Sequence, residues 1–348
     1  MKKQITLNEG AGIIFDSIPD NGEIKVCIGK NGQPDYIWPN KIVLPNHLLN
    51  NLCRKSFCLF HPWQNDIEYI GVNWIINLCA DPDEYQNALI NLDEALGETT
   101  PVFNHPRAIA LSRRDIVAKL MKGVPNLTVP MCLRFTANRK GSFEATFEEG
   151  GFKYPVLVRP TTSQSGHGLL KIDEPSDWQK IYLTHWYKRS FYMSEFIDYR
   201  SANGHYHKVR VSFIGGKPRI RGWQESRDWL LTGSQTELLS DRPDYLVNTI
   251  RSLASNEKFL KMREELAHRL PLDFFGVDIG VKEDEFILFE ATAAMSMARQ
   301  TEDDGATSPL MQEVYAKIEE DLNQILFDPR TWSDKVKALP AVRKILNL

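Results

Sequence analysis

The sequence predicts an α+β fold rather than a doubly wound parallel sheet. From residue 191 onward, runs of alternating apolar and polar residues follow one another directly, and Gly215 and Gly216 suit a hairpin turn between two of them. Segments with apolar residues at helical spacing flank these strands and do not alternate with them. Strands grouped together beside segregated helices are the pattern of α+β proteins.

The composition is that of a globular protein without a strong charge. The chain has 348 residues, of which 42% are hydrophobic, and its formal net charge is −3. This length suits two or three compact units, and no basic excess indicates a nucleic-acid partner. The five cysteines are scattered, so we expect reduced thiols. Because no apolar run approaches the roughly 20 residues of a membrane span, we expect a cytoplasmic protein without a membrane partner.

Residues 1–108 are expected to form an N-terminal lobe. Short apolar runs alternate there with Pro and Gly. A helix is predicted to begin at Asp81, because Pro82 suits a first helical turn and apolar residues then recur at helical spacing. Gly97 is expected to end this helix.

Residues 109–190 are expected to form a second unit. A helix is predicted to start at Ser112, because Ser112 and Asp115 are spaced as in a capping box, and Arg114 then lies in its first turn. A strand over residues 155–160 follows, and a polar loop connects it to a second strand. The loop therefore lies between two strands of one sheet.

The third unit, residues 191–327, contains two acids in a predicted hairpin. Asp278 and Glu290 fall on its two strands, and the apolar residues around them indicate a buried sheet. An unpaired carboxylate is costly there, so a cation is expected beside them. Two such carboxylates can hold Mg²⁺ against the phosphates of a nucleotide. The alternative is a pair of surface acids neutralised by lysines, and the hairpin alone leaves both open. Residues 328–348 are expected to be a peripheral tail.

Taken in order, the motifs resemble those of a known superfamily. The chain carries Arg114 at a predicted helix start, then VLVRP, a Gly-containing loop, YMSEFID, KVRVSFIGGK, FFGVDI and FEATAAM. This order, over roughly residues 100–300, resembles the ATP-grasp superfamily, closest to its glutathione-synthetase and ribosomal-protein glutamate-ligase branch. The resemblance implies an N-terminal α/β lobe followed by two α+β subdomains that clamp ATP between antiparallel sheets. The second unit would carry the phosphate loop and the third the metal site.

The resemblance also implies a reaction and its cofactors. It indicates an ATP- and Mg²⁺-dependent ligase that joins a carboxylate donor to an amine acceptor through an acylphosphate. The acceptor would be an amino acid or a peptide, and a homodimer is among the oligomeric states left open. The residues to which the resemblance assigns nucleotide binding are Arg114, Arg159, Ser165, Gly166, His167, Gly168, Glu195, Phe196, Ile197 and Asp198.

Further roles are implied in the same way. Arg210 would act on the transferred phosphate and the acyl intermediate, with help from Lys208. The implied metal ligands are Asp278, Glu290 and Thr292, and the residues implied to grip a substrate carboxylate are Arg221 and Arg227.

Two positions depart from the family pattern. Arg159 replaces the usual lysine, and Thr292 replaces the usual asparagine. A hydroxyl is a shorter and poorer metal ligand than an amide oxygen, so a nucleotide-binding protein with weak or no catalysis is a second hypothesis. An ATP-grasp phosphotransferase that acts on a hydroxyl is a third.

Overall fold

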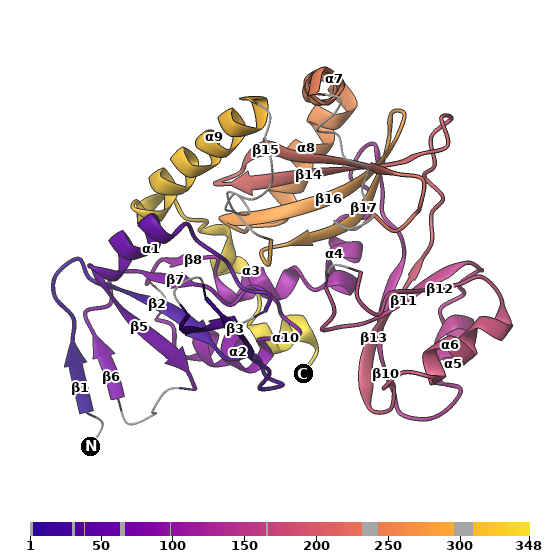
Figure 1. The fold of residues 1–348 in the computed structure, drawn as a ribbon. Coiled ribbons are helices and arrows are strands. Elements are labelled where there is room, and N and C mark those ends of the chain that lie inside the picture. Colours follow the sequence, from indigo (N-terminus) through magenta and orange to yellow (C-terminus); the bar gives the residue numbers. More distant parts are fainter. Residues whose placement is uncertain are drawn as a thin grey trace.

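The computed structural model describes residues 3–29, 32–37, 39–62, 67–97, 99–164, 166–231, 243–295 and 309–348. These residues form an α+β protein with three sheet-containing parts that meet at a central junction (Figure 1). The first part is built on a parallel sheet, and the other two are built on antiparallel or largely antiparallel sheets. The predicted fold class is therefore confirmed.

The N-terminal lobe contains a four-stranded parallel sheet with the order β5-β2-β7-β8. Three of its strands end in a polar residue, Ser17, His61 or Asn77, and Asn77 is fully buried. The strands are β2 (Gly12–Ser17), β5 (Ser56–His61), β7 (Ile75–Asn77) and β8 (Val102–Phe103), and the helices are α1 (Asn46–Cys53), α2 (Gln86–Ala95) and α3 (Pro106–Leu111). Two small sheets adjoin it, β1 (Lys3–Thr6) with β6 (Ile67–Ile70), and β3 (Lys25–Ile28) with β4 (Pro34–Ile37).

Two predicted helix starts are wrong, for local reasons. The helix expected from Asp81 begins only at Gln86, because the Asp81 carboxylate accepts the backbone N–H groups of Asp83 and Glu84 and forms a separate turn. The capping box at Ser112 does not form, because the Ser112 hydroxyl donates to the carbonyl of Ile109 at the end of α3.

The second part is an antiparallel sheet with the order β10-β13-β11-β12 and a hydrophobic core of its own. Phe143 packs edge to face onto Phe191 of the sheet and stacks with Trp178 of a neighbouring helix. The strands are β10 (Cys132–Ala137), β11 (Val156–Pro160), β12 (Leu170–Ile172) and β13 (Arg189–Glu195), and the helices are α5 (Ser142–Glu149), η1 (Pro175–Asp177) and α6 (Trp178–Tyr182).

The third part is a five-stranded sheet with the order β15-β14-β16-β17-β9. Its strands are β9 (Leu127–Thr128), β14 (Tyr206–Ile214), β15 (Lys217–Ser226), β16 (Phe274–Lys282) and β17 (Glu285–Thr292). The helices around it are α7 (Pro243–Ser255), α8 (Glu257–Arg269) and α9 (Pro309–Leu326). α4 (Arg114–Leu120) contacts both β10 and β17, and so lies between the second and third sheets (Figure 1).

The C-terminal segment is not peripheral, contrary to expectation. Residues 328–348 form η3 (Pro329–Thr331), η4 (Lys335–Ala338) and α10 (Val342–Leu346), and α10 contacts α2 and α3 of the N-terminal lobe. Trp332 and Val336 are buried in the main core. Their burial removes apolar surface from water, which explains why this short segment packs back onto the lobe.

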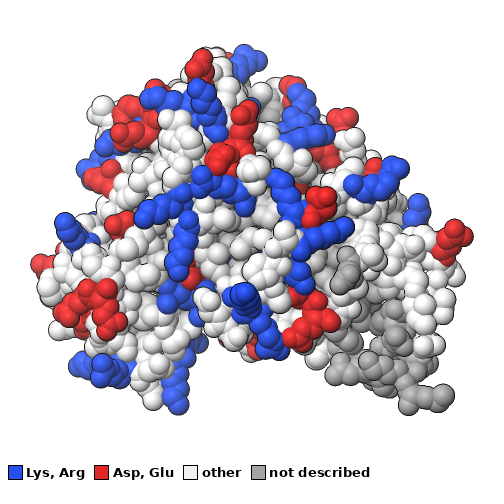
Figure 2. Space-filling model, turned by 180° about the vertical axis from the view of Figure 1, so that it is seen from behind, with Lys and Arg blue, Asp and Glu red and all other residues white. Residues whose placement is uncertain are grey.

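The surface carries a mixture of charges. Figure 2 shows basic side chains in the middle of one face, with acidic side chains beside them. This mixture agrees with the small formal net charge of the chain. Among the helices in the described ranges, none combines the length and the apolar character that crossing a bilayer requires.

Candidate functional site

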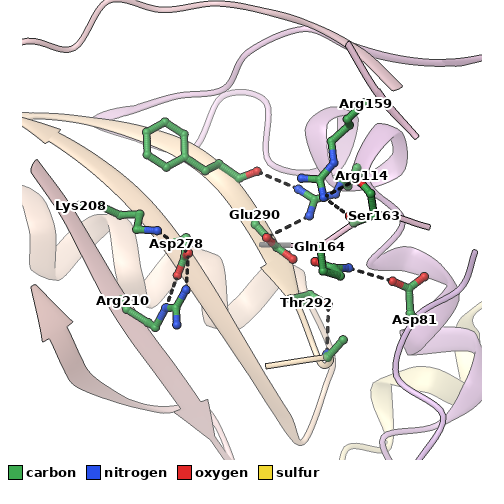
Figure 3. Close-up of polar contacts among 12 residues, drawn as sticks. Asp81, Arg114, Arg159, Ser163, Gln164, Lys208, Arg210, Asp278, Glu290 and Thr292 are labelled. Carbon is green, nitrogen blue, oxygen red and sulfur yellow. Dashed lines mark hydrogen bonds and ion pairs between the residues drawn. The ribbon is translucent and has the colours of Figure 1, made fainter. Parts of the chain in front are cut away.

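Three neighbouring strands place charged residues in one row. Arg210 of β14 pairs in register with Asp278 of β16, which pairs in turn with Glu290 of β17. Residues in register on neighbouring strands point to the same face of a sheet. Lys208 and Thr292 lie two residues from this row on the outer two of these strands, so they share its face. Figure 3 shows this face, with Arg114 and Arg159 across from it.

Asp278 is held by two cations. Its Oδ1 accepts from Arg210 Nε at 2.8 Å, its Oδ2 accepts from Arg210 Nη2 at 2.9 Å, and Lys208 Nζ lies 3.3 Å from Oδ2. Lys208 also donates to the carbonyl of Leu231 at 3.0 Å. Burial acts to raise the pKa of Asp278, but Arg210 and Lys208 outweigh it and the pKa is lowered. Asp278 is therefore a fixed and permanently ionised carboxylate.

Glu290 is paired with the first residue of α4. Arg114 Nη2 lies 2.9 Å from Glu290 Oε2, and Arg114 Nη1 donates to the carbonyl of Phe289 at 3.4 Å. Burial acts to lower the pKa of Arg114, but Glu290 outweighs it and the pKa is raised. The contact between α4 and β17 thus brings a residue of the second predicted unit onto the predicted metal site.

Arg159 of β11 carries a charge that is only partly satisfied. Its Nη2 donates to the carbonyl of Ser163, whereas its buried Nε has no hydrogen-bond partner among the described residues. Burial, followed by the nearby charge of Arg114, lowers the pKa of Arg159 to about 10. A buried guanidinium with an unused donor is costly without an anion beside it. This site therefore suits an anionic ligand.

The loop after β11 has the backbone that the sequence led us to expect. Gly166 and Gly168 have φ values of +77° and +65°, which glycine adopts without strain. A Cβ at Gly168 would lie 3.3 Å from Pro160 Cδ, so the close approach also favours glycine. His167 is exposed, and its backbone N–H donates to the carbonyl of Gln164. Ser165 lies outside the described residues.

The N-terminal lobe contributes an acid that the sequence analysis did not assign to the site. Gln164 Nε2 of the loop donates to Asp81 Oδ2 at 3.1 Å. Asp83 joins the lobe to the second sheet, because it pairs with Arg134 at 2.9 Å and accepts from the Tyr192 hydroxyl. A buried strand followed at its carboxyl end by two acids was the signal that could have located this contact, since ligands bind at that edge of parallel sheets.

The pKa of Asp81 leads to a testable difference in stability. Burial, with a contribution from the charge of Asp83, raises the pKa of Asp81 to about 7. Between its ordinary value and about 7 the folded chain binds a proton that the unfolded chain releases, so ionisation of Asp81 lowers the free energy of unfolding as the pH rises. Asparagine does not titrate. We therefore expect the stability of Asp81→Asn relative to the wild type to be about 1–3 kcal/mol greater at pH ~8 than at pH ~5.

Urea unfolding at the two pH values measures this difference. Asp173→Asn, which changes an exposed acid, is the control and should keep a constant difference from the wild type. If the difference in the free energy of unfolding between Asp81→Asn and the wild type were the same at both pH values, Asp81 would be ionised at both.

Residues 195–198, to which the resemblance assigns nucleotide binding, link the second and third sheets. Glu195 Oε2 accepts from the backbone N–H of Met131 at 2.7 Å, and Asp198 forms an ion pair with Arg200 at 3.3 Å. The ring of Phe196 meets Trp229 edge to face, with centroids 5.6 Å apart, and Lys171 Nζ lies 4.4 Å from the Phe196 centroid. Ile197 packs in the small apolar cluster beside it. Glu195 and Asp198 thus have structural partners, and Lys171 is a nearby cation that the sequence analysis did not single out.

The two arginines predicted to bind substrate are not in equivalent places. The register between β14 and β15 shifts after Arg210, so that Arg221 is an extra residue beside it. Burial, followed by the charge of Arg210, lowers the pKa of Arg221 to about 10, and its buried Nε has no hydrogen-bond partner among the described residues. Arg227 is exposed and follows the end of β15. The structure therefore brings Arg221, and not Arg227, to the row.

The charges of the site are unbalanced. The structure gathers five cations around the two carboxylates Asp278 and Glu290, with Asp81 as a third acid at the edge. The cations are Arg114, Arg159, Lys208, Arg210 and Arg221. A polyphosphate would supply the missing negative charge and accept hydrogen bonds from the unused guanidinium donors.

The acids are too few for an all-protein metal cage. In the described ranges, no three residues of the types His, Cys, Asp and Glu are arranged to hold a metal ion. Mg²⁺ is commonly bound by one or two carboxylates together with water and substrate phosphates. Asp278 and Glu290 therefore fit Mg²⁺ only in company with a phosphate ligand.

Comparison with known proteins gives likenesses in structure alone. No protein-family model and no curated protein matches the chain. D-alanine–D-alanine ligase from Bacillus anthracis is 12% identical with a TM-score of 0.49, over 94% of this chain and 99% of that one. A RimK domain ATP-grasp protein from Sphaerobacter thermophilus is 12% identical with a TM-score of 0.46, over 90% and 100%. ATP-grasp ligase PsnB, with Mg and ADP bound, is 14% identical with a TM-score of 0.46, over 90% and 99%.

The chain is similar to ATP-grasp ligases. Ligases of different kinds are among the similar structures. At TM-scores below 0.5, these structures assign neither a substrate nor an activity to the chain.

Proposed function

We propose that the protein is an ATP-grasp ligase that uses ATP and Mg²⁺ to join a carboxylate to an amine. The observation that carries the proposal is the row formed by Arg210, Asp278 and Glu290 opposite Arg114 and Arg159. The motif order of the sequence supports the same conclusion. ATP would lie between the second and third sheets, in the cytoplasm.

In this proposal the phosphates bind to the two arginines of the second unit. Arg159 has an unused buried donor, and Arg114 can shift part of its hydrogen bonding from Glu290 to a phosphate oxygen. The backbone of the loop with Gly166 and Gly168 would cover the phosphates. Asp278 and Glu290 would hold Mg²⁺, which when bound neutralises charge on the phosphate oxygens.

Arg210 has the position needed to act on the transferred phosphoryl group. It is fixed through Nε and Nη2 on Asp278, yet its side chain is 37% exposed, so the rest of the guanidinium faces the site. Fixed positive charge aimed at developing negative charge is the main means of accelerating phosphoryl transfer. Arg221 beside it would bind the donor carboxylate. No protein nucleophile is required, because the amine substrate attacks the acylphosphate itself.

One observation favours the second hypothesis of weak catalysis. The Thr292 hydroxyl oxygen accepts the backbone N–H of Ala294 at 3.0 Å, so it is already engaged in the turn after β17. An engaged hydroxyl is a poor third ligand for Mg²⁺. A protein limited in this way would bind ATP and turn it over slowly.

The Thr292→Asn variant tests this limit. The amide oxygen of asparagine reaches further than a hydroxyl and has two lone pairs, so it can accept this N–H and still bind the metal, and we expect the affinity of the variant for Mg²⁺ in the presence of ATP to rise about tenfold. The apparent Mg²⁺ affinity is measured from the Mg²⁺ dependence of ADP release. Thr292→Ser is the matched control and should behave like the wild type. An unchanged or weaker affinity in Thr292→Asn would mean that the site has adapted to threonine.

The reaction itself is tested by the coupling of ADP release to two substrates. Candidate amino acids, dipeptides and peptides are offered singly and in pairs. A ligase releases ADP and phosphate in proportion to the amide formed and only when donor and acceptor are both present. ADP release with a stable phosphorylated product from one substrate would instead identify a phosphotransferase.

A further inference from the structure

A cavity of about 1090 Å³ lies away from the candidate site. One wall comes from the residues just before the strands of the parallel sheet, with Lys55 before β5, Trp74 before β7 and Pro101 before β8. The facing wall comes from the end of α9 and from residues 328–337. Asp81, in contrast, follows the carboxyl end of β7. The cavity and the candidate site therefore lie toward opposite edges of the same sheet.

The charged lining of the cavity is predominantly cationic. Four of its residues are cations and two are acids, namely Lys55, Arg107, Arg330 and Lys337 against Asp328 and Asp334. Arg107 and Arg330 are neutralised, by Asp93 at 2.6 Å and by Asp328 at 2.7 Å. Neither Lys55 nor Lys337 forms an ion pair within the part of the chain that the structure describes. Asp334 has no ion pair in that part of the chain either, so two ammonium groups and one carboxylate remain, with a net positive charge for an anionic ligand.

A neutral donor accompanies the lysines. His105 Nδ1 accepts from the backbone N–H of Arg107 at 3.2 Å, so the proton of the neutral ring is on Nε2. Burial lowers the pKa of His105 to about 4, which keeps the ring neutral at ordinary pH. Trp74, Leu96 and Phe327 add apolar surface to the same lining. The lining therefore combines anion-binding donors with apolar walls.

We propose that this cavity binds a small organic anion, with a carboxylate or phosphate group between Lys55, Lys337 and His105 and an apolar body against Trp74 and Phe327. Such a mixture of apolar walls and a few polar groups is typical of ligand sites. The lysines recognise the charge, which a carboxylate and a phosphate share.

A hydrogen-bonded network connects this cavity to the start of the strand that carries Asp278. Asp273 Oδ1 accepts from the N–H of Ser333 in the cavity wall at 2.7 Å, and Asp273 Oδ2 accepts from the N–H of Asn104 at 2.7 Å. Asn104, which precedes His105, holds both backbone groups of Phe274, at 2.8 Å and 2.9 Å. Phe274 begins β16, which carries Asp278.

The occupant would therefore act as an effector. A ligand that fixes His105 and the 328–337 segment also fixes Asn104 and Asp273, and through them the start of β16. This regulatory part rests on the proposed function, whereas binding in the cavity does not.

Binding is tested without nucleotide, so that its failure is separate from failure of the ligase proposal. The probes are inorganic phosphate, benzoate and the neutral benzamide, and calorimetry measures the binding of each one. We expect benzoate or phosphate to bind the wild type, and to bind about tenfold more weakly when both lysines are removed in K55A/K337A. Whichever of benzoate and phosphate binds more tightly shows whether the cavity prefers a carboxylate or a phosphate. The neutral benzamide should bind more weakly than benzoate.

A control variant makes the test decisive. K153A/K261A removes two exposed lysines outside the cavity and should bind as the wild type does. Equal binding by K55A/K337A and the wild type, or equal binding of benzamide and benzoate, would overturn the site.

The connection to β16 has a readout of its own. Hydrogen exchange of the amides in residues 273–278 should slow when the probe binds to the wild type. Exchange that is unchanged at saturating probe would overturn the effector role.

Discussion

Replacing Glu290 by Gln is expected to lower Mg²⁺-dependent ATP turnover by at least ~10²-fold. The amide keeps the size of the side chain but removes the charge that holds Mg²⁺ and pairs with Arg114 at 2.9 Å. An amide oxygen is a weaker ligand than a carboxylate, and Arg114 loses its ionic partner. ADP release as a function of Mg²⁺ concentration measures the effect.

The fold should survive this change, because the Glu290 side chain is about one-fifth exposed and replaceable by an isostere. Glu265→Gln, which breaks the surface pair with Arg269 on α8, is the control for loss of one acid and should retain full turnover. Turnover by Glu290→Gln at the wild-type rate would remove Glu290 from the metal site.

Arg210→Gln is expected to lower kcat by ~10²- to 10³-fold, with a smaller effect on the affinity for ATP. Arg210 is placed to act on the group being transferred, whereas Arg114 and Arg159 are placed to bind the phosphates that remain. The variant should also lose about 1–3 kcal/mol of stability, since Lys208 is then the only ionic partner of Asp278 among the described residues. Arg210→Lys should recover part of the stability and little of the rate, because the ammonium cannot replace both hydrogen bonds.

A matched variant separates the two effects of this change. Arg219 lies on the same sheet and forms an ion pair with the buried Asp321 of α9 at 2.8 Å, which Arg219→Gln breaks. This variant should lose stability like Arg210→Gln and keep its rate. If the two variants lost the same fraction of kcat, the effect at Arg210 would be one of folding alone.

Features that depend on neighbouring parts of the sequence could be predicted. Asp278 and Glu290 lie on one hairpin, so their closeness was predictable, but a register shift after Asp278, which the sequence did not reveal, is what pairs them directly on one face. The strand with Arg159 and the glycine loop after it are likewise local. Arg210 was assigned only through the resemblance, because β14 and β16 are far apart in the sequence and their pairing depends on the whole sheet.

Features that depend on contacts between parts could not be predicted. Asp81 meets Gln164 because the N-terminal lobe packs against the second sheet, and no local pattern encodes that packing. The sequence analysis gave Asn104 no role, yet this residue is fully buried and joins the lobe to β16. The C-terminal segment reads as a tail because its helices are short, and its burial depends on the surface that it covers.

Calorimetric titration with ATP, with and without Mg²⁺, tests the central claim most directly. The account predicts Mg²⁺-dependent binding by the wild type, with affinity lost in Arg159→Ala and reduced in Glu290→Gln while both variants remain folded. Absence of binding heat in the wild type, or equal affinity in Arg159→Ala, would contradict it.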